Sequence, residues 1–175
     1  KMSKIASYTK DIEQVVEKSG IRVLAPIKDS GLVGFEIPLD ERTFPTAPKA
    51  RGFEVAIGQT VMGEARRFDI RQAPHMLVAG SSGSGKSVFL NNLINQLLTI
   101  PRVELHLFDP KQVELVQFEG ESKVKEYQSH HAAIAISLEA LCEEMEERYK
   151  AMKEVRAKSI EDMPDMRYKF VVIDE

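Results

Sequence analysis

The sequence predicts an α/β fold built on a parallel β-sheet that helices cover on both faces. The strand candidates in the second half of the chain are largely apolar, and the clearest are Val103–Phe108 and Tyr168–Glu175. Helical segments alternate with these strands. Strands that are buried on both faces lose the alternation of polar and apolar residues, so the two observations together favour a parallel sheet. In such sheets, ligands bind at the carboxyl ends of the strands.

A small α/β subdomain is predicted to come first, over residues 1–48. Apolar residues recur at helical spacing across Ile5–Val16, which predicts a helix. Two strand-like segments follow at Ile21–Ile27 and Leu32–Ile37, joined by a short polar turn that is typical of a hairpin. This unit is too small to be stable alone, so we expect it to pack on the rest of the protein.

The main domain is predicted over residues 49–175. The stretch Thr43–Gly52 contains two prolines and one glycine and has no periodicity, which marks it as the boundary. Short strands are predicted at Phe53–Ile57 and Arg67–Ile70. They lead to a strand at His75–Ala79, which is expected to be buried because it is almost entirely apolar.

A long amphipathic helix is predicted from Ile134 to Met152, with an acidic face that is expected to be solvated. Cys142 falls on its apolar face and is expected to be a buried small hydrophobic residue. A single cysteine excludes an internal disulfide. The chain also has no signal-peptide segment and no apolar run near the roughly 18 residues that a membrane span needs. We therefore expect a cytoplasmic protein with no membrane segment in this chain.

The composition is that of a soluble globular protein, with 43% hydrophobic and 29% charged residues. A chain of 175 residues can hold one core and a small appendage. The net charge of −3 does not by itself indicate a nucleic-acid partner. The four histidines show no metal-ligand spacing with cysteine or acidic residues, so a metal site built on them is not expected.

Eight residues that follow the strand at His75–Ala79 match the phosphate-binding loop pattern G-x-x-x-x-G-K-[ST] at every fixed position. Glycines allow the backbone N–H groups of such a loop to converge on phosphate oxygens, and the helix that begins here presents its positive end to the same anion. Lys86 adds a positive charge at the β- and γ-phosphates, and Ser87 adds a hydroxyl ligand for Mg²⁺. The nucleotide-binding residues are therefore predicted to be Gly80, Ser81, Ser82, Gly83, Ser84, Gly85, Lys86, Ser87 and Val88.

The apolar strand that delivers Asp174 and Glu175 is typical of the acidic motif that accompanies a phosphate loop. Asp174 is predicted to hold Mg²⁺, and Glu175 to polarise the attacking water. The adjacent glutamate favours hydrolysis over transfer to a second substrate. A polar cluster at Asp109–Lys111 follows another strand, so three clusters are predicted to meet at one edge of the sheet. The catalytic residues are predicted to be Lys86 and Glu175, and the cofactors ATP and Mg²⁺.

Four stretches resemble the FtsK/SpoIIIE family of DNA translocases, in the same order as in that family. They are Ile21–Ile27 with Gly31–Pro38, Pro74–Ser87, Phe108–Leu115 and Glu144–Met152. The resemblance implies a RecA-like P-loop NTPase core after a small α/β subdomain. It also implies an ATPase whose homo-hexameric ring pumps double-stranded DNA through its pore, in chromosome segregation or DNA transfer. A full-length relative is expected to have an inner-membrane anchor outside this region.

The chain departs from the family pattern in two places. Residues 121–129 are charged where the family carries an apolar loop, and the chain ends at Glu175. We therefore expect an incomplete core sheet, with the trans-acting arginine and pore loops supplied elsewhere. Two alternatives remain open from the sequence. One is a related ring ATPase that drives protein secretion, and the net negative charge of the chain fits that function slightly better than DNA translocation. The other is a nucleotide-binding fragment without turnover.

Overall fold

Two units make up the chain, Lys1–Pro45 and Thr46–Glu175. The computed structural model describes residues 7–24, 27, 31–41, 46, 48–60 and 62–174. Residues 43–45 and 47 of the predicted boundary region Thr43–Gly52 fall outside these residues, so the position of the boundary stays a prediction.

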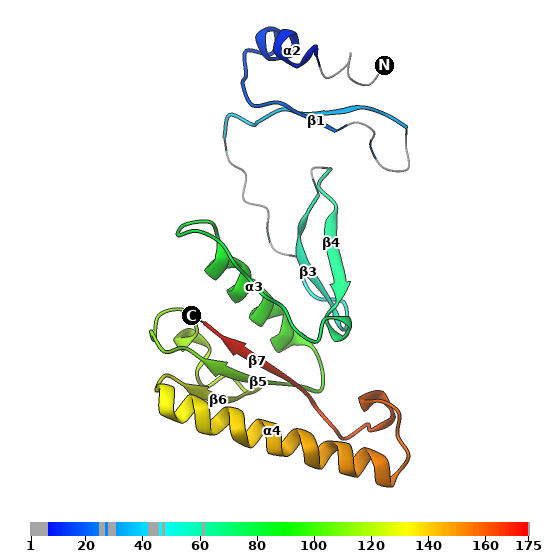
Figure 1. Cartoon of the computed structure of the whole chain (residues 1–175), viewed down its shortest axis with the longest axis vertical. Coiled ribbons are helices and arrows are strands. Elements are labelled where there is room, and N and C mark those ends of the chain that lie inside the picture. Colours follow the sequence, from blue (N-terminus) through cyan, green and yellow to red (C-terminus); the bar gives the residue numbers. More distant parts are fainter. Residues whose placement is uncertain are drawn as a thin grey trace. The chain divides into compact units, whose positions relative to one another are not determined.

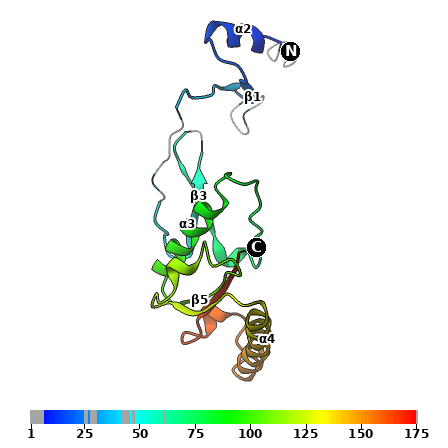
Figure 2. The same cartoon turned by 90° about the vertical axis from the view of Figure 1, so that its left-hand side faces the viewer.

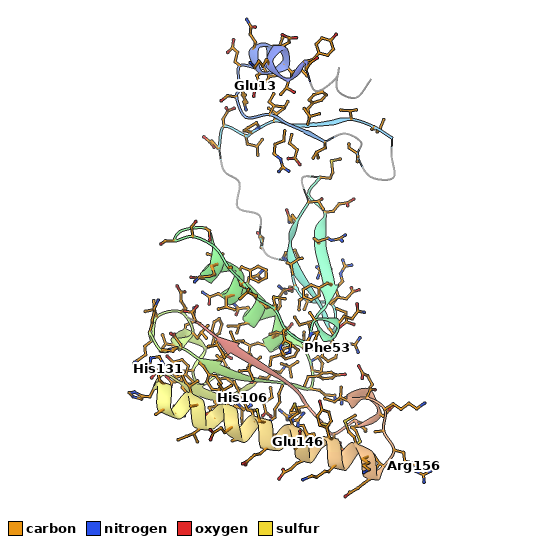
Figure 3. All side chains as sticks on the ribbon, in the orientation of Figure 1. Glu13, Phe53, His106, His131, Glu146 and Arg156 are labelled. Carbon is orange, nitrogen blue, oxygen red and sulfur yellow. The ribbon has the colours of Figure 1, made fainter. Side chains whose placement is uncertain are left out.

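The first unit is a short helix followed by a two-stranded antiparallel sheet (Figure 1). Helix α2 covers Thr9–Val15, and strands β1 (Arg22–Leu24) and β2 (Gly34–Glu36) pair with each other. The predicted helix and hairpin are therefore present, although residues 28–30 of the turn lie outside the described segments. The Glu13 side chain accepts hydrogen bonds from the backbone N–H groups of Gly20 and Ile21, at 2.7 and 3.2 Å. It thereby fastens the helix to the start of β1 (Figure 3).

The second unit begins with an antiparallel hairpin of β3 (Glu54–Gln59) and β4 (Ala65–Asp69). Both strands were predicted, with slightly different ends. Val55 and Ala56 of β3 are buried. The buried side chain of Gln96, on the following helix, pairs with both backbone groups of Ala56 at 2.8 and 2.9 Å. These two bonds satisfy the hydrogen-bonding groups of an amide that would otherwise be costly to bury.

A three-stranded parallel sheet forms the centre of the second unit, in the order β6-β5-β7. Strand β5 covers Val103–Phe108 and β7 covers Tyr168–Ile173, as predicted, while β6 (Val124–Gln128) occupies a segment for which no strand was predicted. Both neighbours pair with β5 in parallel. The predicted α/β class with a parallel sheet is therefore confirmed.

Helices cover both faces of this sheet. Helix α3 (Lys86–Thr99) lies on one face and helix α4 (His131–Glu154) on the other (Figures 1 and 2). Alternate side chains of β5 lie on the two faces of the sheet. Its Val103, Leu105 and Leu107 are buried in the apolar core with α3, whereas Glu104 and His106 belong to a polar network beneath α4.

That polar network joins α4 to the sheet. Ser137 of α4 donates to Glu126 of β6 at 2.5 Å, and Glu126 also contacts the His106 ring at 3.2 Å. Farther along the helix, Lys169 of β7 lies between Glu144 of α4 and Glu104, whose carboxylate is 3.1 Å away. The two helices therefore pack on the sheet by different means, α3 through apolar contacts and α4 largely through charges.

Two sequence predictions are wrong. Residues 75–80 form no strand, and Leu77 is 92% exposed. A strand needs a neighbour for its N–H and C=O groups, and none of the described residues pairs with this segment. Cys142 is exposed rather than buried, because it lines a cavity beside β7 instead of packing in the core.

Candidate functional site

The predicted phosphate loop connects the segment at residues 75–80 to α3, whose first residue is Lys86. Two of its glycines have left-handed backbones, Gly83 with φ of 75° and Gly85 with φ of 100°. At Gly80 the constraint is steric, since an added Cβ would lie 2.3 Å from the Ser84 hydroxyl oxygen. The left-handed backbone favours glycine at Gly83 and Gly85, whereas a Cβ at Gly80 would require the Ser84 side chain to move.

The polar residues of the pattern lie in the first turn of α3. Lys86 and Ser87 are half-buried, whereas Val88 is 73% exposed. The first backbone N–H groups of a helix have no intrahelical partner, and the N-cap residue Gly85 makes no side-chain cap. Helix starts of this kind favour anions.

Two acidic residues follow the neighbouring strands β5 and β7. The Asp174 N–H donates to the Phe108 carbonyl at 3.0 Å, which continues the pairing of β7 with β5 by one residue. Asp109 follows Phe108 and is fully buried, and Asp174 is 8% exposed. Figure 1 shows that these strand ends and the first turn of α3 lie on the same side of the unit.

A cavity of about 1090 Å³ opens beside β7 and includes both Lys86 and Asp174 in its lining. The rest of its wall is largely apolar and comes from residues 73–78, α3, α4 and β7. Lys86, the predicted phosphate-binding lysine, and Asp174, the predicted metal-binding aspartate, therefore border the same cavity. Glu175, the predicted catalytic acid, lies outside the described residues.

Glu114 was not predicted as a site residue, yet it contacts the phosphate loop directly. The Ser87 hydroxyl donates to Glu114 Oε1 at 2.6 Å, and this bond is partly buried. Glu114 follows β5 on a turn that is held by Asp109, whose Oδ2 accepts from the N–H groups of Glu114 and Leu115. Its place in the Asp109–Leu115 run was the only signal in the sequence.

The charged groups near the end of β5 include the acidic residues Asp109 and Glu119. Burial raises the pKa of the Tyr127 hydroxyl, and the negative charges of Asp109 and Glu119 raise it further. Asp109 Oδ1 is buried and accepts no hydrogen bond from the described residues. Asp109 and Asp174, at the ends of β5 and β7, and the Ser87 hydroxyl each offer oxygen atoms as donors.

Oxygen donors are the chemical type that a magnesium ion bound with a nucleotide requires. Mg²⁺ prefers oxygen ligands and is usually held by one or two protein groups plus phosphates and water. Within the described residues, no group of three or more His, Cys, Asp or Glu side chains could hold a metal ion. No helix in the same part of the chain is long and apolar enough to cross a membrane.

Comparisons with known proteins identify what the chain resembles. The FtsK/SpoIIIE family pattern matches residues 42–172. The chain is 35% identical to the DNA translocase FtsK of Corynebacterium glutamicum, in an alignment that covers 93% of this chain and 19% of the relative. It is also 35% identical to the protein of that name from Mycobacterium leprae, in an alignment that covers 92% of this chain and 21% of the relative. Its identity to the DNA translocase FtsK of Staphylococcus epidermidis is 32%, in an alignment that covers 100% of this chain and 25% of the relative. The chain thus spans only about a fifth to a quarter of these curated relatives.

Proposed function

The chain belongs to the FtsK/SpoIIIE family, and from that premise we propose that it supplies the nucleotide-binding part of an ATP-driven motor that translocates double-stranded DNA. The similar proteins of known name are DNA translocases. Through the same resemblance we propose that the complete motor is a homo-hexameric ring and that it acts in chromosome segregation or DNA transfer.

The observation that carries this proposal is the shared cavity of Lys86 and Asp174. The backbone of the loop from Gly80 to Ser87 would surround the phosphates of ATP, and the Lys86 ammonium would contact their β- and γ-oxygens. Ser87 and Asp174 would hold magnesium. A magnesium ion bound there supplies positive charge that neutralises the phosphate oxygens during transfer.

The hydrolytic step is assigned to Glu175 from the sequence. A carboxylate directly after the metal-binding aspartate would be suited to act on a water at the γ-phosphate. Its role is to orient that water and accept a proton from it. The arginine that stabilises the charge of the transferred phosphoryl group is proposed to come from a neighbouring subunit, since trans-acting arginines raise the rates of analogous NTPases by about 10³–10⁵.

The direct test is titration of the chain with a fluorescently labelled ATP analogue in the presence of Mg²⁺. Lys86→Ala is expected to weaken binding at least about tenfold, or roughly 1.4 kcal/mol, because a charge-assisted contact to phosphate is lost. The matched control is Lys150→Ala, which removes an exposed lysine from α4. Equal affinity in wild type and Lys86→Ala would refute the assignment of the loop.

The acidic character of the chain favours one alternative partner. A net charge of −3 suits a ring ATPase that moves protein slightly better than one that moves DNA. ATP hydrolysis by a longer protein that includes this chain separates the two, because double-stranded DNA should stimulate a DNA motor and leave a protein motor unchanged. Magnesium-dependent hydrolysis by this chain alone would exclude a binding module without turnover.

A further inference from the structure

We propose that Glu114 is a positioning residue of the magnesium–nucleotide site, acting through Ser87. This inference rests on the proposed function and deepens it. The hydroxyl of Ser87 is the group expected to ligate magnesium, and its hydrogen is already committed to the Glu114 carboxylate at 2.6 Å.

The chemistry of a hydroxyl explains why that contact matters. A serine hydroxyl has one hydrogen to donate and two lone pairs to offer. When the hydrogen points to a carboxylate, the lone pairs are directed elsewhere and the oxygen gains electron density. Partners of this kind orient metal ligands and strengthen their donor power. Glu114 therefore presents the Ser87 oxygen in the orientation and with the polarity that a hard cation requires.

The fold fixes Glu114 in this position from behind. Asp109 Oδ2 accepts from the Glu114 N–H at 3.1 Å and from the Leu115 N–H at 2.9 Å. Leu115 is fully buried in the core cluster, and the Gln117 amide donates to the Glu114 carbonyl at 2.9 Å. The backbone of Glu114 is thus anchored on both sides, and its side chain is half-buried. A mobile surface glutamate would not meet Ser87 in so defined a way.

A second observation at the same place points to a charged ligand. Asp109 is fully buried, and its Oδ1 has no hydrogen-bond partner among the described residues. A buried carboxylate oxygen without a partner is unfavourable unless water or a cation satisfies it. Asp109 and Glu114 therefore place two negative groups behind Ser87, which favours a cation on that side of the loop and opposes bare phosphate.

Glu114 should affect nucleotide binding differently with and without magnesium. With Mg²⁺ present, Glu114 should strengthen nucleotide binding through Ser87. With EDTA present, its negative charge should repel the phosphates or leave their binding unchanged. A glutamate with a merely structural role would support binding equally in both conditions.

The experiment measures the affinity for a fluorescently labelled, non-hydrolysable ATP analogue in Mg²⁺ and in EDTA, with the full chain and with circular dichroism as a check on folding. The dissociation constant in EDTA divided by the dissociation constant in Mg²⁺ gives the magnesium dependence of binding. Glu114→Ala should reduce that ratio about 10–100-fold, and Glu114→Gln should reduce it less because its amide oxygen still accepts from Ser87. The affinity in EDTA should stay the same or rise. Glu121→Gln, an exposed carboxylate of the same loop region, should change neither value.

A double-mutant cycle tests whether Glu114 acts through Ser87. In the Ser87→Ala background, Glu114→Gln should cause no further loss of magnesium dependence. Binding of Mn²⁺ with the nucleotide, followed by electron paramagnetic resonance, gives the same comparison without relying on the fluorescent label. An unchanged ratio, or a parallel loss of affinity in both conditions, would overturn the inference while leaving nucleotide binding intact. A wild-type chain that binds no nucleotide in either condition would instead refute the proposed function, and the inference with it.

Discussion

The backbone N–H of Asp174 donates to the carbonyl oxygen of Phe108 at 3.0 Å. This bond lies at the last rung of the β5–β7 ladder, so it places Asp174 next to Asp109 at the carboxyl edge of the sheet. Both aspartates are buried. Pairing with β5 therefore positions the acidic end of β7.

Separate roles are predicted for the two acids after β7. Glu175→Gln should retain nucleotide binding and slow hydrolysis, because the group that orients the water is lost while Asp174 stays. Asp174→Asn should instead weaken the magnesium dependence of binding. Single-turnover hydrolysis by a longer protein that includes this chain measures the first effect, and nucleotide titration of this chain the second. Unchanged hydrolysis in Glu175→Gln would mean that another residue activates the water.

The phosphate loop, α3, α4, β5 and β7 could be predicted because each has a local signal. The loop has a fixed spacing of glycine, lysine and serine, the helices have apolar periodicity, and the two strands are short apolar runs. Their order along the chain was enough to predict a parallel sheet with its polar clusters at one edge.

Features that depend on a distant partner could not be predicted. The sequence of strand β6 (Val124–Gln128) is partly polar because Glu126 forms a polar contact with His106, while Val124 and Tyr127 pack on the core. The apolar segment at residues 75–79 has the composition of a strand, but none of the described residues pairs with it. Glu114 has no motif of its own, and only the folded turn after β5 brings it to Ser87.

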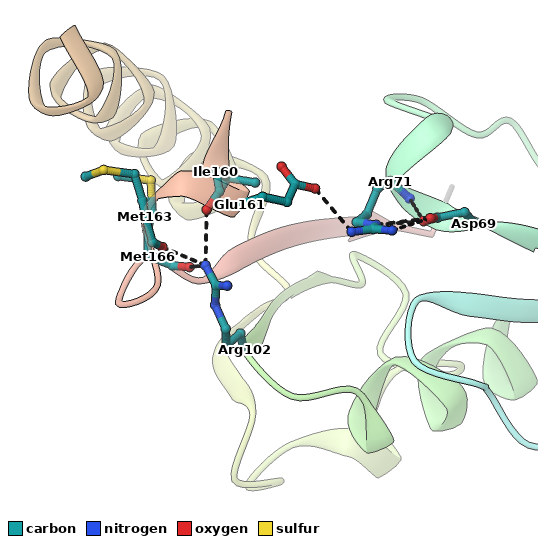
Figure 4. A network of polar contacts seen from close by, with 7 residues as sticks. All are labelled: Asp69, Arg71, Arg102, Ile160, Glu161, Met163 and Met166. Carbon is teal, nitrogen blue, oxygen red and sulfur yellow. Dashed lines mark hydrogen bonds and ion pairs between the residues drawn. The ribbon is translucent and has the colours of Figure 1, made fainter. Parts of the chain in front are cut away.

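Arg102 is predicted to be a main determinant of stability at the base of the sheet. Its Nη2 donates to the carbonyls of Ile160, Met163 and Met166 at 3.2, 2.6 and 2.7 Å, and its own carbonyl accepts from the Tyr168 N–H at 2.7 Å (Figure 4). It therefore ties the segment before β7 to the start of β5. Arg102→Met should lower the free energy of unfolding by about 2–3 kcal/mol, because the carbonyls lose a charged donor.

The matched control for Arg102 is Arg156, which shares its left-handed backbone. Arg102 has φ of 60° and Arg156 has φ of 57°, but the Arg156 side chain is exposed. Arg156→Met should change the free energy of unfolding by less than about 0.5 kcal/mol. Urea unfolding followed by circular dichroism suits both variants, since the chain has no tryptophan. Similar losses in the two variants would mean that backbone conformation, and not the three carbonyl contacts, sets the cost.

Acid is predicted to destabilise the second unit through the carboxylates around Lys169. Burial by itself would raise the pKa of Glu104 and of Glu144, but the neighbouring cationic groups, Lys169 foremost, together outweigh it, so the pKa of each lies below its usual value. Arg148 lowers the pKa of Glu144 further, and His106 that of Glu104. A carboxyl with a lower pKa in the folded state stabilises the protein above its unfolded-state pKa. That stability is lost as the pH falls through the folded-state value.

The test compares wild type with Lys169→Met by urea unfolding between about pH 3.5 and 7. The wild-type free energy of unfolding should fall steeply below about pH 4.5, and the variant should fall less steeply, because its two carboxyls keep pKa values nearer those of the unfolded chain. Near neutral pH the variant should be less stable by roughly 1–2 kcal/mol, less than for a fully buried pair because the Glu144 side chain is 37% exposed. Lys150→Met on the exposed side of α4 should retain the wild-type pH profile. The same acid slope in wild type and Lys169→Met would show that carboxyls elsewhere control the acid response.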